Sequence, residues 1–79
     1  MWYVYVLKSV EKNWTYVGFS TRLKKRIQEH NAGKNQPTKA YAPFVLKTFV
    51  AVDSQEKARE LEKYFKTGSG IAWMKKRLL

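Results

Sequence analysis

A continuous apolar run at the start of the chain constrains the fold most strongly. The segment Trp2–Leu7, WYVYVL, is rich in aromatic and β-branched residues, which predicts a β-strand. Because no position in the run is charged or strongly polar, the strand needs cover on both faces and belongs in the centre of a small sheet. Alternation puts Tyr3, Tyr5 and Leu7 on one face and Trp2, Val4 and Val6 on the other.

Two further strands are expected beside this one. The short strand Trp14–Val17 follows the polar segment Ser9–Asn13, so the first two strands form a hairpin. The third strand is Phe44–Val52, whose length and β-branched content are typical of a strand. A chain of 79 residues has room for one modest core, so residues 1–79 are expected to form a single domain.

The first helix is expected directly after the hairpin. Gly18 ends the second strand, and Ser20 caps a helix from Thr21 to about Asn31. The helix stops near Gly33, which can take the left-handed conformation common at helix ends. The following segment, Lys34–Pro43, has prolines near both ends and no periodicity, which predicts a loop.

Two more helices are expected after the third strand. Asp53 caps a helix that runs to about Lys66, and Glu56 completes a capping-box pattern. A break at Thr67–Gly70 precedes a short terminal helix at Ile71–Leu79, with Ile71, Met74 and Leu78 turned inward. The expected class is α/β in the α+β sense, with a three-stranded, mainly antiparallel sheet flanked by helices in the order β-β-α-β-α-α.

Charge points to a polyanionic partner. Sixteen Lys and Arg against six Asp and Glu give a formal net charge of +10. Nucleic acid is the first expectation and an anionic membrane surface a distant second. The basic residues expected to contact a phosphate backbone lie on the first helix, the loop after it and the end of the second helix: Arg22, Lys24, Lys25, Lys34, Lys39 and Lys66.

Composition also excludes several classes of chemistry. The chain has no cysteine, which excludes disulfides, thiolate nucleophiles and zinc sites of the cysteine type. No secretory leader is recognisable, and no stretch approaches the roughly 20 apolar residues of a membrane span. We therefore expect a cytoplasmic protein that does not enter membranes.

One constellation carries chemistry. Arg22, Arg26 and His30 recur every fourth residue and would line one helix face, directly after the strand that bears Tyr16. A tyrosine, an arginine and a histidine would then converge. Such groups activate nucleophiles and stabilise anionic charge, which is what phosphodiester chemistry requires.

These residues also resemble a known family. Tyr3-Val4-Tyr5 and Tyr16-Val17-Gly18 match its paired signatures, with Arg26 ten residues after Tyr16 and His30 four residues further on. A helix pattern of the form Ala-x-x-Leu-Glu-x-x-x-Lys is filled by Ala58, Leu61, Glu62 and Lys66. In order and spacing the chain resembles the GIY-YIG nuclease superfamily. It is most similar to the small stand-alone bacterial type and to the N-terminal domain of the excinuclease C family.

The resemblance implies metal-dependent hydrolysis of DNA phosphodiester bonds, with nicking directed by DNA structure rather than sequence. The catalytic residues it implies are Tyr5, Tyr16, Arg26, His30 and Glu62. Glu62 would hold one Mg²⁺ or Mn²⁺, and Arg26 would clamp the phosphate. Tyr16 or Tyr5 would activate water, with His30 orienting the tyrosine or a phosphate oxygen. A tyrosine normally has a pKa of about 10, which nearby arginines and the metal would lower.

Departures from the pattern and alternatives remain. Tyr3 stands where the first signature has glycine, and Phe19 where many members carry a lysine or another polar residue. The alternative function is a nucleic-acid-binding module that keeps the fold without turnover, with DNA or RNA as ligand. Cutting both strands would require a transient dimer or two sequential nicks, and a chain this short is compatible with a protein partner that supplies targeting.

Overall fold

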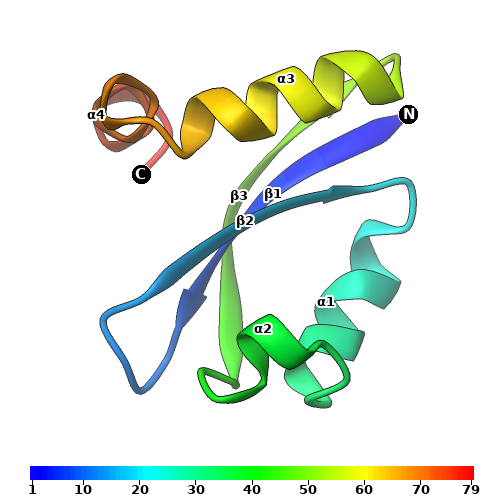
Figure 1. The fold of residues 1–79 in the computed structure, drawn as a ribbon, viewed down its shortest axis with the longest axis vertical. Helices are drawn as coiled ribbons and strands as arrows, with labels where there is room; N and C mark the ends of the chain where they lie inside the picture. The colour runs from blue at the N-terminus through cyan, green and yellow to red at the C-terminus, as the bar shows by residue number, and fades with distance from the viewer.

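The protein is built on a three-stranded antiparallel sheet with the first strand in its centre. The computed structural model describes all residues 1–79. Its strands β1 (Trp2–Ser9), β2 (Thr15–Ser20) and β3 (Phe44–Val52) are arranged in the order β2-β1-β3 (Figure 1). The central position predicted for the first strand is confirmed.

Helices cover both faces of the sheet. In Figure 1, α3 (Gln55–Phe65) and α4 (Gly68–Arg77) lie on one side, while α1 (Leu23–Asn31) and α2 (Gln36–Lys39) lie on the other. The predicted α+β class and element order are confirmed, with α2 as an additional short helix. No helix is long and apolar enough to cross a membrane.

The alternation of β1 divides the core in two. Val4 and Val6 pack under α3 and α4, against residues such as Ala58, Phe65 and Met74. Tyr5 and Leu7 point the other way, toward α1 and α2, and pack with Phe44. The two face assignments predicted for β1 are therefore confirmed, and the tyrosine face is the one that α1 covers.

The second strand is longer than predicted because Gly18 does not end it. Gly18 pairs with Tyr5, and β2 continues to Ser20. A Cβ atom on Gly18 would lie 2.6 Å from the Tyr5 hydroxyl and 2.9 Å from a ring carbon of Tyr16. The glycine therefore leaves room for two tyrosine rings of the protein itself.

Two of the predicted helix caps are wrong. No side chain caps α1, which begins at Leu23; the Ser20 Oγ instead accepts a hydrogen bond from the Arg22 backbone N–H at 3.0 Å, just before the helix.

The cap of α3 is also displaced. Ser54 caps this helix by accepting from the Lys57 N–H, and the Asp53 carboxylate pairs with the Lys57 Nζ at 2.9 Å instead. Because the cap lies one residue later than predicted, Glu56 is out of register for a capping box. The prediction for the end of α1 is confirmed, since Gly33 has a φ of +73°.

The predicted break at Thr67–Gly70 is mostly helix. Thr67 caps α4 by accepting from the Gly70 N–H, so the helix begins at Gly68 rather than Ile71. Gly70 is buried against the backbone of Tyr64, which fixes the angle between α3 and α4. In this register Met74 is buried as expected, but Ile71 is 41% exposed.

Candidate active site

A buried pair of side chains forms the centre of the candidate site. Tyr5, on the central strand, lies with its hydroxyl oxygen 3.0 Å from the Nε2 of His30, on α1. Both residues are almost completely buried. Residues 25 positions apart are thereby joined across the space between sheet and helix.

The pair continues into a line of hydrogen bonds that defines its protons. The Thr38 hydroxyl lies 2.8 Å from the Nδ1 of His30 and donates to the Asn35 carbonyl at 3.3 Å. Since the Thr38 proton is used there, Thr38 accepts from Nδ1–H, and Nε2 is left as an acceptor. The Tyr5 hydroxyl then donates to His30, and the imidazole is neutral.

Burial favours the same protonation states. It lowers the pKa of His30, and the nearby Arg26 charge acts in the same direction. Burial also raises the pKa of Tyr5, with the neighbouring Tyr16 as the next largest cause, while Arg26 opposes the shift. The expectation that arginines lower the pKa of a catalytic tyrosine therefore does not hold for Tyr5, because desolvation outweighs the nearby positive charge.

Arg26 lies on the edge of this centre and is half-buried. Its guanidinium is close enough to Tyr5 to stabilise a phenolate there, and it also pairs with Glu29 at 2.9 Å. The hydrogen bond to Glu29 raises the pKa of Arg26 and, from the other side, lowers that of Glu29. Arg22, predicted to share the helix face of Arg26 and His30, instead lies at the cap position just before α1 and is exposed.

Tyr16 brings the second signature to the same place. It lies on edge strand β2 and is half-buried, with its ring centroid 5.1 Å from that of His30 and 6.4 Å from that of Tyr5. The ammonium of Lys66, from α3, lies 5.9 Å from the Tyr16 ring centroid. Tyr16 is thus the site tyrosine that combines contact with His30 and access to solvent.

Glu62 approaches from the helix layer on the opposite face of the sheet. After burial and the tyrosine and arginine neighbours, its charge is a further influence on the pKa of Tyr5, which it raises. Its side chain is 19% exposed and pairs with Lys66 at 3.3 Å. No group of three His, Cys, Asp or Glu residues is placed to enclose a metal. A lone carboxylate fits Mg²⁺, which commonly takes one or two carboxylates and completes its shell with water and substrate phosphate.

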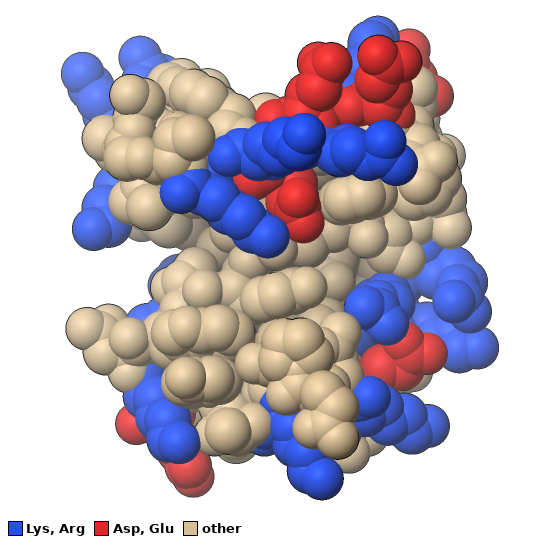
Figure 2. All heavy atoms as spheres, in the orientation of Figure 1, with Lys and Arg blue, Asp and Glu red and all other residues tan.

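The predicted phosphate-contacting residues do not form one patch. Arg22, Lys24 and Lys25 line a shallow hollow with Tyr3 and Phe49. Two others, Lys34 and Lys39, are exposed on either side of α2, and Lys66 lies beside Glu62 and Tyr16. In Figure 2 charged side chains surround a band without charge that crosses this face.

Thr38 is the site residue that the sequence did not reveal. It is fully buried on α2, in the segment predicted to be a loop. The overlooked signal is Pro37, which lies in the first turn of α2, where a proline favours a helix start. Because α2 is one turn long, no hydrophobic periodicity marks it.

The chain's relationships agree with this arrangement. The family described as the GIY-YIG catalytic domain matches residues 1–76. The chain therefore belongs to the GIY-YIG family of nuclease domains.

Relatives of the chain are found in Streptococcus pyogenes. A UPF0213 protein of serotype M1 is 43% identical over 65 residues, which cover 81% of this chain and 70% of the relative. A UPF0213 protein of serotype M5 is 42% identical over the same length and shares. No solved structure matches the chain.

The neutral, buried His30 predicts an acid-sensitive fold. The pKa of His30 is lowered in the folded state, so the unfolded chain binds more protons below its own histidine pKa of about 6.5. The free energy of unfolding is expected to fall as the pH drops from about 7 to 5.5, by at most about 1.4 kcal/mol per pH unit. Urea titrations across this range measure the slope.

His30 is the protein's single histidine, so the slope can be assigned to it. A His30→Gln variant has no side chain that titrates in this range and should give a flat profile. An equal slope in both proteins would show that His30 is not the group responsible.

Proposed function

We propose that the protein is a metal-dependent endonuclease that nicks DNA, with a preference set by DNA structure rather than sequence. The observation that carries the proposal is the meeting of Tyr5, Tyr16 and His30 beside Arg26 and Glu62, from elements on both faces of the sheet. A phosphodiester resists attack because its negative charge repels nucleophiles, so a site needs a base, cationic groups and a metal ligand. This chain supplies each of them.

The residues have separate roles in this proposal. Tyr16, the more accessible tyrosine, faces the attacking water and takes its proton. Tyr5 keeps its proton at neutral pH and donates it to the His30 Nε2, which holds the imidazole against Tyr16. Arg26 exchanges its contact with Glu29 for the scissile phosphate, where its planar fork matches two phosphate oxygens.

Glu62 is the proposed ligand for one Mg²⁺ or Mn²⁺. When bound, the ion supplies positive charge to the phosphate and the leaving oxygen. Glu62 would turn from Lys66 toward the ion, and Lys66 would be freed for the DNA backbone. The substrate is proposed to be DNA in the cytoplasm; cleavage of RNA in place of DNA, or a protein partner or dimer that directs the cut, would refine this assignment.

A second candidate is a nucleic-acid-binding module without turnover. The observation that favours it is the pairing of both Arg26 and Glu62 with oppositely charged neighbours. If those pairs persist on DNA, the site holds nucleic acid and does not cut it.

Cleavage of labelled nicked, branched, duplex and single-stranded DNA separates the two candidates. We expect the wild-type protein to nick DNA with Mg²⁺ or Mn²⁺ and to be inactive in EDTA. Tyr16→Phe removes the proposed base and should reduce the rate by about 10²-fold or more. Binding of all substrates without cleavage of any would establish the binding module instead.

A further inference from the structure

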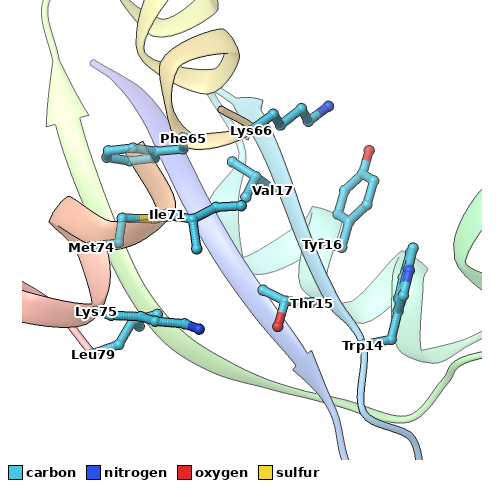
Figure 3. A pocket seen from close by; sticks show the side chains of 10 residues that line it. All are labelled: Trp14, Thr15, Tyr16, Val17, Phe65, Lys66, Ile71, Met74, Lys75 and Leu79. Atoms are coloured by element: carbon cyan, nitrogen blue, oxygen red, sulfur yellow. The ribbon is translucent and has the colours of Figure 1, made fainter. Parts of the chain in front are cut away.

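A groove outside the Tyr5–His30 centre lies between the edge strand β2 and the terminal helix α4. It has a volume of about 530 Å³, within the range of roughly 300–1,000 Å³ typical of small-ligand sites. One wall is formed by Trp14–Val17, and the other by residues of α4 and the C-terminal Leu79 (Figure 3). In Figure 2 the surface is hollowed on the left, between α4 and the β1–β2 hairpin.

The groove combines apolar walls with positive ends. Seven of its ten lining residues are hydrophobic, and none is acidic. In Figure 3 the Lys66 side chain lies at one end beside Tyr16, and the Lys75 side chain extends toward Thr15 at the other. Lys75 has no ion-pair partner. The groove thus suits a flat apolar group that carries negative charge on each side.

Tyr16 belongs to both the groove and the proposed active site. Its ring lines the groove and lies 5.1 Å from the His30 ring. Trp14 lies next to it, with ring centroids 6.0 Å apart, and is itself held by stacking on Tyr41 at 4.0 Å. A group in the groove would therefore meet fixed aromatic surfaces directly beside the proposed base.

We propose that this groove binds an unpaired nucleobase next to the phosphate that is cut. The proposal rests on the nuclease function above and specifies its substrate as DNA with a single-stranded segment at the nick site. Bases in a duplex are already stacked on their neighbours and cannot enter, whereas an unpaired base can leave its strand and stack on protein aromatics. Lys66 and Lys75 then contact the phosphates on either side of the base.

The test is equilibrium binding in EDTA, where no cleavage occurs, to labelled DNA with and without an unpaired flap but with identical duplex arms. The wild-type protein should bind the flapped DNA about tenfold more tightly, as expected from stacking of one base. Ile71→Asp places a charge in the groove wall at an exposed position, so the fold should tolerate it, and should abolish the preference.

Adjacent residues of the same helix provide matched controls. Ala72 is exposed and does not line the groove, so Ala72→Asp makes the same change in net charge and should keep the preference for flapped DNA. Lys75→Ala should weaken binding of flapped DNA and make it less dependent on salt, while Lys76→Ala, one residue beyond the groove lining, should do so less.

The outcomes separate the groove from the catalytic proposal. Equal binding of both DNAs by the wild type, or a preference that survives Ile71→Asp, would overturn the groove assignment even if the protein cuts DNA. A preference that is lost only in Ile71→Asp would support the groove even if no cleavage is found. If Ile71→Asp instead dissociates a dimer of the free protein, the groove is a contact between two copies and the proposal is wrong.

Discussion

Glu62→Gln is expected to abolish metal-dependent cleavage and leave DNA binding largely intact. Glu62 is the carboxylate whose charge reaches Tyr5, and no cluster of other acids is placed to replace it as a metal ligand. The amide has nearly the same shape and keeps one oxygen, but it lacks the negative charge that attracts a divalent ion. Initial nicking rates with Mg²⁺ should fall to those of the wild type in EDTA.

Glu60→Gln is the matched control for this variant. Glu60 lies on the same helix and is exposed, so the same substitution there changes the net charge equally without touching the site. Its nicking rate should equal that of the wild type. A Glu62→Gln protein that retains Mg²⁺-stimulated cleavage would rule out Glu62 as the metal ligand.

Gly70→Ala is expected to cost the largest share of folding stability. A Cβ atom at Gly70 would collide with the backbone carbonyl of Tyr64 and lie 2.9 Å from the Cα of Phe65. Backbone atoms cannot rotate away as a side chain can, so α4 must move from α3 and expose part of the core around Met74. We expect a loss of about 3 kcal/mol, which lowers the Tm by more than about 10 °C in thermal unfolding.

The same substitution two residues earlier should have the opposite effect. A Cβ atom at Gly68 would meet nothing within 4 Å. Gly68 begins α4, so alanine there reduces the freedom of the unfolded chain and should stabilise the protein by about 0.4–1 kcal/mol. Equal Tm values for Gly68→Ala and Gly70→Ala would contradict the packing described for the junction of α3 and α4.

Patterns that repeat along the chain could be read from the sequence. The uninterrupted apolar content of Trp2–Leu7 requires cover on both faces, and this is enough to place it in the centre of the sheet. The boundaries of α1, α3 and α4 could not be read as well. Ser20, Asp53 and Ser54 can all accept a cap hydrogen bond, and the choice between them depends on where the neighbouring strand ends.

The site residues were predicted by their spacing, but their protonation was not. Spacing places Tyr5, Tyr16 and His30 on elements that can meet, and in the structure their rings do meet. Thr38 could not be foreseen as their partner, because it lies in a one-turn helix whose position depends on the completed core. The direction of the Tyr5 pKa shift was also missed, since desolvation is a property of packing and leaves no mark in the sequence.

The three ion pairs of the molecule have one feature in common, which is that each is local. Arg26–Glu29, Lys57–Asp53 and Lys66–Glu62 join residues three or four positions apart, and no ion pair links one element to another. The attachment of helices to sheet thus depends on apolar contacts and hydrogen bonds, which added salt does not screen. A protein with a formal charge of +10 can therefore release DNA in strong salt while its tertiary structure stays assembled, so that capture and folding answer to different properties of the solvent.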